Sequence, residues 1–161
     1  MAIKGTYGPE NAKIVLVGDA LSKYEYDNGI IINKYTRNLL LDFLEDAGFD
    51  SDDVLYVPCF SGSKLSGMKL DGTTLQEDAE EWLFPIIRKH PRRIVIGLGN
   101  NAVCALGLVD KPEGINKLRS KWLKSPKLPD IPLAAAIHPK LVSDKPDENG
   151  DDFFADLTYA K

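Results

Sequence analysis

The sequence predicts one α/β domain built on a parallel four-stranded sheet with helices on both faces. The chain of 161 residues is long enough for a single well-packed domain, residues 1–161, and short for two. Short apolar runs that stop at turn residues alternate with segments of helical periodicity. That alternation is typical of a parallel sheet covered by helices.

The first half of the chain predicts two strands and one helix. Two runs rich in β-branched residues stop at a glycine or a proline, which favours short buried strands. Between them, apolar residues recur at helical spacing and Gly48 offers a helix end. In chain order these elements are a strand at 14–17, a loop at 19–33, a helix at 34–47 and a strand at 54–57.

The second half continues the alternation. A Gly-, Ser- and Lys-rich loop at 59–72 precedes the capping-box pattern Thr74-Leu75-Gln76-Glu77, which opens a helix that Pro85 should kink or break. The stretch "RRIVIGLG" predicts a third strand, and "NNAVCALG" a short helix capped by Asn100 or Asn101. The stretch "PLAAAIH" predicts a fourth strand, and "DDFFADLTYA" a closing helix.

Composition excludes several classes of protein. No apolar run approaches the roughly 20 residues of a membrane span, and the first ten residues lack the apolar core of a signal peptide. Two cysteines are too few for a disulfide framework. The spacing of the two cysteines and two histidines does not match that of a metal site. We therefore expect a cytoplasmic monomer without metal or cofactor.

The charge distribution bears on nucleic-acid binding. A net charge of −4 argues mildly against it. However, the stretch "KLRSKWLKSPK" from Lys117 to Lys127 contains five basic residues, Trp122 and no acid. This run has two interpretations: an ordinary solvated face, or a phosphate-contacting loop with an aromatic ring for stacking or wedging.

Polar or reactive side chains follow each predicted strand. The carboxyl ends of neighbouring parallel strands meet at one edge of a sheet, where α/β folds bind ligands. Each residue also has a structural explanation: a turn or helix cap for the acid and the amides, and a small buried side chain for the cysteine. Glycine before the acid would let a ligand approach the backbone closely. The residues are Gly18 and Asp19, then Cys59, then Asn100 and Asn101, and finally His138.

The order of these pieces resembles the uracil-DNA glycosylase superfamily, most closely its family 4 branch. The stretch "GDALS" is similar to the family's Gly-Glu-Ala-Pro-Gly, and "FLEDAG" to the family's next helix, which reads roughly Leu-Leu-Glu-Glu-Ala-Gly. "IVIGLGNNAVCALG" resembles the third strand and its helix, "INKLRSKW" the Leu-Arg-Gly loop, and "AIHPKLV" the His-Pro motif. The resemblance covers the chain from about Lys13 to Leu157.

The resemblance implies roles for particular residues. Asp19 and His138 would be catalytic. The base pocket would include Gly18, Ala20, Ile32, Cys59 and Asn100. DNA contacts would come from Lys117, Arg119, Ser120, Lys121, Lys124, Pro139 and Lys140. The family's iron–sulfur cluster needs four cysteines, so no cluster is expected in a chain that has two.

The function expected from this resemblance is a DNA glycosylase that hydrolyses the N-glycosidic bond of a flipped uracil or related damaged base. The alternative is a catalytically inactive module of the same fold that binds DNA or a replication or repair partner. Ile32 and Cys59 replace the family's stacking phenylalanine and its asparagine, which favours the inactive module. The acidic first motif and the His-Pro motif favour the enzyme. A flavodoxin-like binder of small nucleotides is the third possibility.

Overall fold

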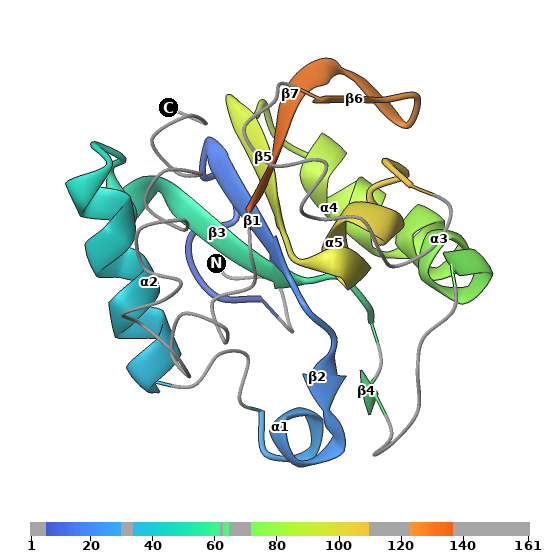
Figure 1. Cartoon of the computed structure of the whole chain (residues 1–161), viewed down its shortest axis with the longest axis horizontal. Helices are drawn as coiled ribbons and strands as arrows, with labels where there is room; N and C mark the ends of the chain where they lie inside the picture. Colours follow the sequence, from blue (N-terminus) through green and yellow to red (C-terminus); the bar gives the residue numbers. More distant parts are fainter. Residues whose placement is uncertain (1–5, 30–33, 62, 65–71, 110–122, 137–161) are drawn as a thin grey trace.

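The computed structural model describes residues 6–29, 34–61, 63–64, 72–109 and 123–136. These residues form an α/β fold with a five-stranded sheet and a separate two-stranded pair (Figure 1). In chain order the elements are β1 (Ile14–Gly18), β2 (Leu21–Ser22), α1 (Lys23–Asp27), α2 (Lys34–Asp46), a 3₁₀ turn (Ser51–Asp53), β3 (Val54–Pro58), β4 (Ser63–Lys64), α3 (Gly72–Glu81), α4 (Leu83–Arg88), β5 (Ile94–Leu98), α5 (Asn100–Ala105), β6 (Leu123–Ser125) and β7 (Leu128–Ala136).

The main sheet is mixed, which corrects the predicted four-stranded parallel sheet. Its order is β3-β1-β5-β7-β6. The strands β1, β3, β5 and β7 are parallel and correspond to the four predicted strands, whereas β6 is an added edge strand antiparallel to β7. The sequence does not reveal β6 because three residues within a basic run are too short to show strand periodicity.

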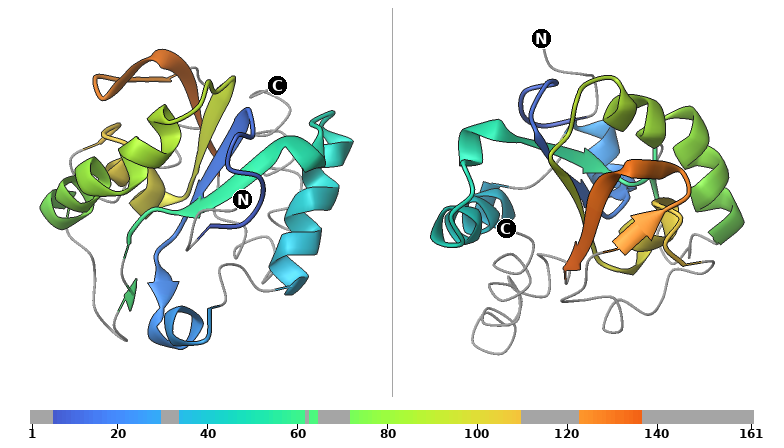
Figure 2. Two further views of the ribbon diagram at one scale, coloured as in Figure 1. Left: turned by 180° about the vertical axis from the view of Figure 1, so that it is seen from behind. Right: turned by 90° about the horizontal axis from the view of Figure 1, so that it is seen from above.

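Helices cover both faces of this sheet. On one face, Leu40 and Leu44 of α2 pack in a cluster with Leu16 of β1. On the other face, α3, α4 and α5 pack in a second cluster, in which Leu83 lies with Val15. The view from above in Figure 2 shows α2 on one side of the strands and α3 and α4 on the other. Every residue of β1, β3 and β5 is buried, as expected for parallel strands covered on both faces.

Other regions also differ from the predicted elements: the expected loop 59–72 contains β4, and β7 begins at Leu128, earlier than expected. The helix expected from Thr74 begins earlier, at Gly72, and is divided into α3 and α4 at Trp82. Pro85 lies in the first turn of α4, where its missing N–H group costs no hydrogen bond, so the break comes before the proline. The segment 19–33, expected to be a loop, contains the short elements β2 and α1.

A buried arginine joins α4 to the start of the sheet. The guanidinium of Arg92 donates to the carbonyl oxygens of Ile87 (3.0 Å) and Ile86 (2.9 Å), and also to that of Ala12. These carbonyls include the last ones of a helix, which lack partners within the helix. Desolvation lowers the pKa of Arg92, so the hydrogen bonds of this guanidinium compensate for its removal from water.

Candidate functional site at the strand ends

The polar residues after β1 and β5 lie where the chain changes direction across the sheet. From β1 the chain passes through α2 on one face to β3, and from β3 it returns through α3 and α4 on the other face to β5. The connections that leave β1 and β5 therefore diverge to opposite faces. In doubly wound α/β proteins this position, outside the carboxyl ends of the two strands, binds the ligand. Asp19 follows β1, and Asn100 and Asn101 begin α5 after β5.

The carboxylate of Asp19 is held by groups from both strand ends. Its Oδ1 atom accepts a hydrogen bond from Asn101 Nδ2 at 2.6 Å and another from the backbone N–H of Ala20 at 2.8 Å. Asn101 lies 82 residues further along the chain, so the contact forms only when β1 and β5 pair. Two donors to one oxygen fix the orientation of this half-buried carboxylate.

The structure shows that the amide of Asn101 contacts Asp19. The strand pattern places both asparagines after the third strand, and the family resemblance selects Asn100 for the base pocket. Gly99 precedes them with φ of 95°, a backbone conformation that favours glycine and sets the direction in which α5 begins. That local geometry decides which side chain reaches β1. No sequence signal points to it, beyond the presence of two amides at a strand end.

Cys59 lies behind the strand end and is completely buried. Its backbone N–H donates to the carbonyl oxygen of Gly18 at 2.9 Å, which continues the pairing of β3 with β1. Burial, and secondarily the charge of Asp19, raises the pKa of the Cys59 thiol well above its ordinary value. The thiol is therefore neutral and shielded, which is the behaviour of a packing residue and not of a nucleophile.

Tyr56 is a neighbour of the site that the sequence interpretation missed. Its hydroxyl lies against Gly18, so close that a Cβ atom at Gly18 would be 1.8 Å from the Tyr56 oxygen. The space above this glycine, expected to admit a ligand, is thus filled by a tyrosine. Burial raises the pKa of Tyr56, and the negative charges of Cys59 in its ionised form, of Asp19 and of Glu25 raise it further. A tyrosine in an otherwise aliphatic strand was the signal that could have indicated it.

The described part of the basic run lies away from Asp19. Lys124 is exposed on β6, which pairs with β7 between Leu128 and Leu133, near the amino ends of the parallel strands. In Figure 1 the β6–β7 turn is at the opposite end of the sheet from α1, which follows Asp19 closely in the chain. Lys127 forms an ion pair with Glu80, which offsets its charge. The other sites expected from the sequence lie outside the described residues: Ile32, Lys117, Arg119, Ser120, Lys121, His138, Pro139 and Lys140.

Metal-binding clusters and membrane-spanning helices are absent from the described ranges. No group of three or more His, Cys, Asp or Glu residues there is arranged to hold a metal ion. None of the helices in those ranges has the length and apolar character that crossing a bilayer requires. Comparison of the chain with models of known protein families and with curated proteins finds no match.

Proposed function

We propose that this chain is a DNA glycosylase of the uracil-DNA glycosylase type, which hydrolyses the N-glycosidic bond of a flipped uracil or related damaged base. The observation that carries the proposal is the Asp19 carboxylate, fixed by Asn101 and the Ala20 amide at the ligand-binding edge of a doubly wound sheet. The family's acidic first motif would occupy this same position.

The chemistry of base excision gives Asp19 a defined role. The bond between C1′ of the sugar and the base nitrogen breaks, its electron pair leaves with the base, and a water oxygen bonds to C1′. The water loses one proton, and the departed base anion takes up one proton. The sugar passes through a cationic, oxocarbenium-like state, which a fixed carboxylate stabilises while it orients the attacking water. His138, in the motif that resembles the family's His-Pro, would donate a hydrogen bond to the departing base and offset its negative charge.

Exposed aromatic side chains near the strand ends support a nucleic-acid substrate. Tyr24 and Tyr26 of α1 are 70% and 51% exposed, and only Ala20 and the two residues of β2 separate α1 from Asp19. Nucleobases that leave the stack of a duplex need flat surfaces on which to lie. Tyrosine rings at this edge provide such surfaces without a requirement for a particular sequence.

The inactive module remains the second candidate because of Cys59. This residue stands where the family has an asparagine for the base, and its side chain is fully buried and neutral at ordinary pH. A site that lacks this polar contact binds a flipped pyrimidine less specifically. The same fold would then serve to bind DNA or a repair partner.

A single-turnover excision assay tests the proposal. Defined single- and double-stranded oligonucleotides would carry uracil, hypoxanthine, xanthine or an oxidised pyrimidine. We expect excision of at least one base, reduced about a hundredfold by His138→Ala and at least about tenfold by Asp19→Asn. Asp130→Asn, which removes an exposed charge on β7, is the matched control and should excise at the unmodified rate.

The result also separates the two candidates. DNA binding without excision of any of these bases, even after Ile32→Phe and Cys59→Asn restore the family's residues, would contradict the enzyme and favour the binding module. Absence of DNA binding would contradict the enzyme and a DNA-binding module, and would leave only a module that binds a repair partner.

A further inference from the structure

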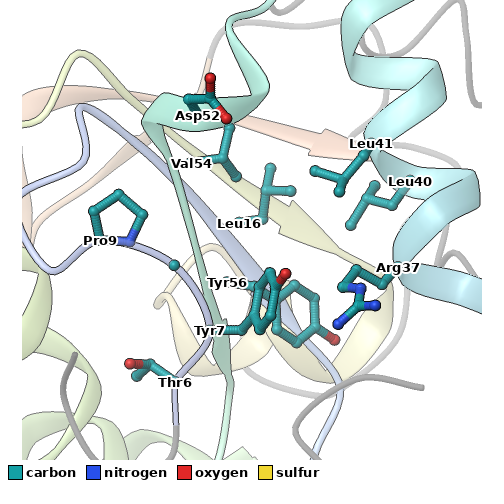
Figure 3. A pocket seen from close by; sticks show the side chains of 11 residues that line it. Thr6, Tyr7, Pro9, Leu16, Arg37, Leu40, Leu41, Asp52, Val54 and Tyr56 are labelled. Atoms are coloured by element: carbon teal, nitrogen blue, oxygen red, sulfur yellow. The ribbon is translucent and has the colours of Figure 1, made fainter. Parts of the chain in front are cut away.

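A pocket of about 550 Å³ lies between α2 and residues 6–9, on the face of the sheet opposite α3, α4 and α5. Leu16 and Val54 from the sheet and Leu40 from α2 give it apolar walls (Figure 3). Its volume falls within the range of pockets that bind small molecules, roughly 300–1,000 Å³. The interpretation of the sequence did not predict this pocket, and the reaction proposed for Asp19 does not use it.

The wall formed by residues 6–9 is fixed to the sheet. Tyr7 and Tyr56 exchange two backbone hydrogen bonds of 2.9 and 2.7 Å, which add one residue pair to the free edge of β3. Gly8 has φ of 109°, and a Cβ atom there would lie 2.2 Å from the carbonyl oxygen of Val54. Only glycine permits the segment to lie this close to the strand. The pocket is therefore bounded by ordered backbone on this side.

Two aromatic rings and one guanidinium lie together in this pocket. Figure 3 shows the side chains of Tyr7 and Tyr56 next to each other, with Arg37 from α2 beside them. The guanidinium carbon of Arg37 is 5.2 Å from the centre of the Tyr7 ring, a cation–π contact. A guanidinium that stacks on a ring through its face keeps its N–H groups, at its edge, for an anion.

The charge of Arg37 is not balanced by a carboxylate in the described ranges. Its contact there is the Tyr7 ring, and no ion pair joins it to a described acid. Asp52, the acid that lines this pocket, lies at its other end in Figure 3. A half-buried guanidinium at the end of an apolar pocket favours a ligand with one negative group, because bidentate hydrogen bonds to carboxylate or phosphate are strong.

We propose that this pocket binds a small molecule made of a planar ring and one anionic group. The ring lies against Tyr7 and Tyr56, and the anion accepts hydrogen bonds from Arg37. An aromatic carboxylate and a nucleoside monophosphate share this chemistry. The site does not depend on the glycosylase proposal, since Asp19 and Asn101 do not line the pocket.

Calorimetric titration of the full chain tests the proposal with two charged probes, 4-hydroxybenzoate and deoxyadenosine monophosphate. Their uncharged counterparts are 4-hydroxybenzyl alcohol and deoxyadenosine. We expect one charged probe to bind with 1:1 stoichiometry and its counterpart to bind at least about tenfold more weakly, which distinguishes the carboxylate from the nucleotide. Methyl resonances of Leu16, Leu40 and Val54 should shift on binding.

Variants locate the contact. Arg37→Gln should weaken binding of the charged probe about tenfold or more, whereas Arg93→Gln removes an exposed positive charge elsewhere and should not change it. Tyr7→Leu keeps the backbone pairing with Tyr56 and should also weaken binding. Circular dichroism checks that each variant is folded; if Arg37→Gln is not, Tyr7→Leu and the methyl shifts decide.

Asp19→Asn should leave binding unchanged, which separates this site from the glycosylase proposal. Failure of both charged probes to bind, or binding that Arg37→Gln and Tyr7→Leu leave intact, would overturn the proposal.

Discussion

Replacement of Gly18 by alanine tests whether the contact between this glycine and Tyr56 shapes the end of β1. The new Cβ atom would lie 1.8 Å from the Tyr56 oxygen, 2.4 Å from Cζ and 2.9 Å from Cε2. Non-bonded carbon atoms normally approach to about 3.5–4.0 Å. Three atoms of a buried ring must therefore move, and the requirement for glycine here is one of space, because Gly18 is not among the described glycines with positive φ.

The expected loss of stability follows from this overlap. Overpacking a core by one methyl group costs about 1–3 kcal/mol. We expect about 2–3 kcal/mol for Gly18→Ala, because the ring that must move has only 7% of its surface exposed and lies beside a paired strand. Urea unfolding followed by circular dichroism measures the change in the free energy of unfolding. If the slope of this free energy against urea concentration is the same in the variant, the folded and unfolded states have kept their compactness.

A double-mutant cycle identifies the cause. Tyr56→Leu removes the three ring atoms and should by itself cost about 2 kcal/mol of packing. In the Tyr56→Leu background, Gly18→Ala should cost at least about 1 kcal/mol less than in the unmodified chain. Gly29→Ala is the control, since nothing lies within 4 Å of an added Cβ there and only its φ of 68° opposes alanine. Additive costs, or a change below about 0.5 kcal/mol for Gly18→Ala, would refute the reasoning.

Three further predictions rest on other contacts. Arg92→Met should lower the free energy of unfolding by about 3 kcal/mol, because three buried carbonyls lose their hydrogen-bond donor. A loss below about 1 kcal/mol would show that water replaces the guanidinium as donor. Burial raises the pKa of Cys59 above its ordinary 9.0, so the unfolded thiol ionises first as pH rises. The contribution of this thiol to the free energy of unfolding should be level below about pH 8 and fall from about pH 9, and Cys59→Ala should reduce that fall. Tyr24→Ala and Tyr26→Ala should each weaken binding of single-stranded DNA about fivefold or more in a fluorescence anisotropy titration, since stacking contributes about 1–3 kcal/mol per base; unchanged affinity would remove α1 from the proposed DNA surface.

Much of the architecture could be predicted because it depends on local patterns. The β-branched runs at Ile14–Gly18, Val54–Pro58 and Ile94–Leu98 are too short and too apolar for exposed helices, and the turn residues that end them are visible in the sequence. Their parallel arrangement follows from the helices between them. The expectation that polar residues after these strands gather at one edge is a consequence of the same arrangement.

The edge strand and the position of the basic residues could not be predicted in this way. The strand β6 contains three residues, and its pairing with residues 128–133 of β7 depends on which edge of the sheet is free. That pairing places Lys124 near the amino ends of the parallel strands, away from Asp19. A cluster of charges in the sequence carries no information about which end of a sheet it will occupy.

The sequence by itself determined the α/β class, the four parallel strands and the candidate carboxylate Asp19, because these depend on side-chain type and short-range periodicity. Only the tertiary structure decided that Asn101 holds that carboxylate and that Tyr56 fills the space above Gly18. Both contacts join residues that are distant in the chain and that meet only when β1 pairs with β3 and β5. The geometry of such pairs is set by strand register and by the direction in which a helix begins, and these are properties of the assembled sheet.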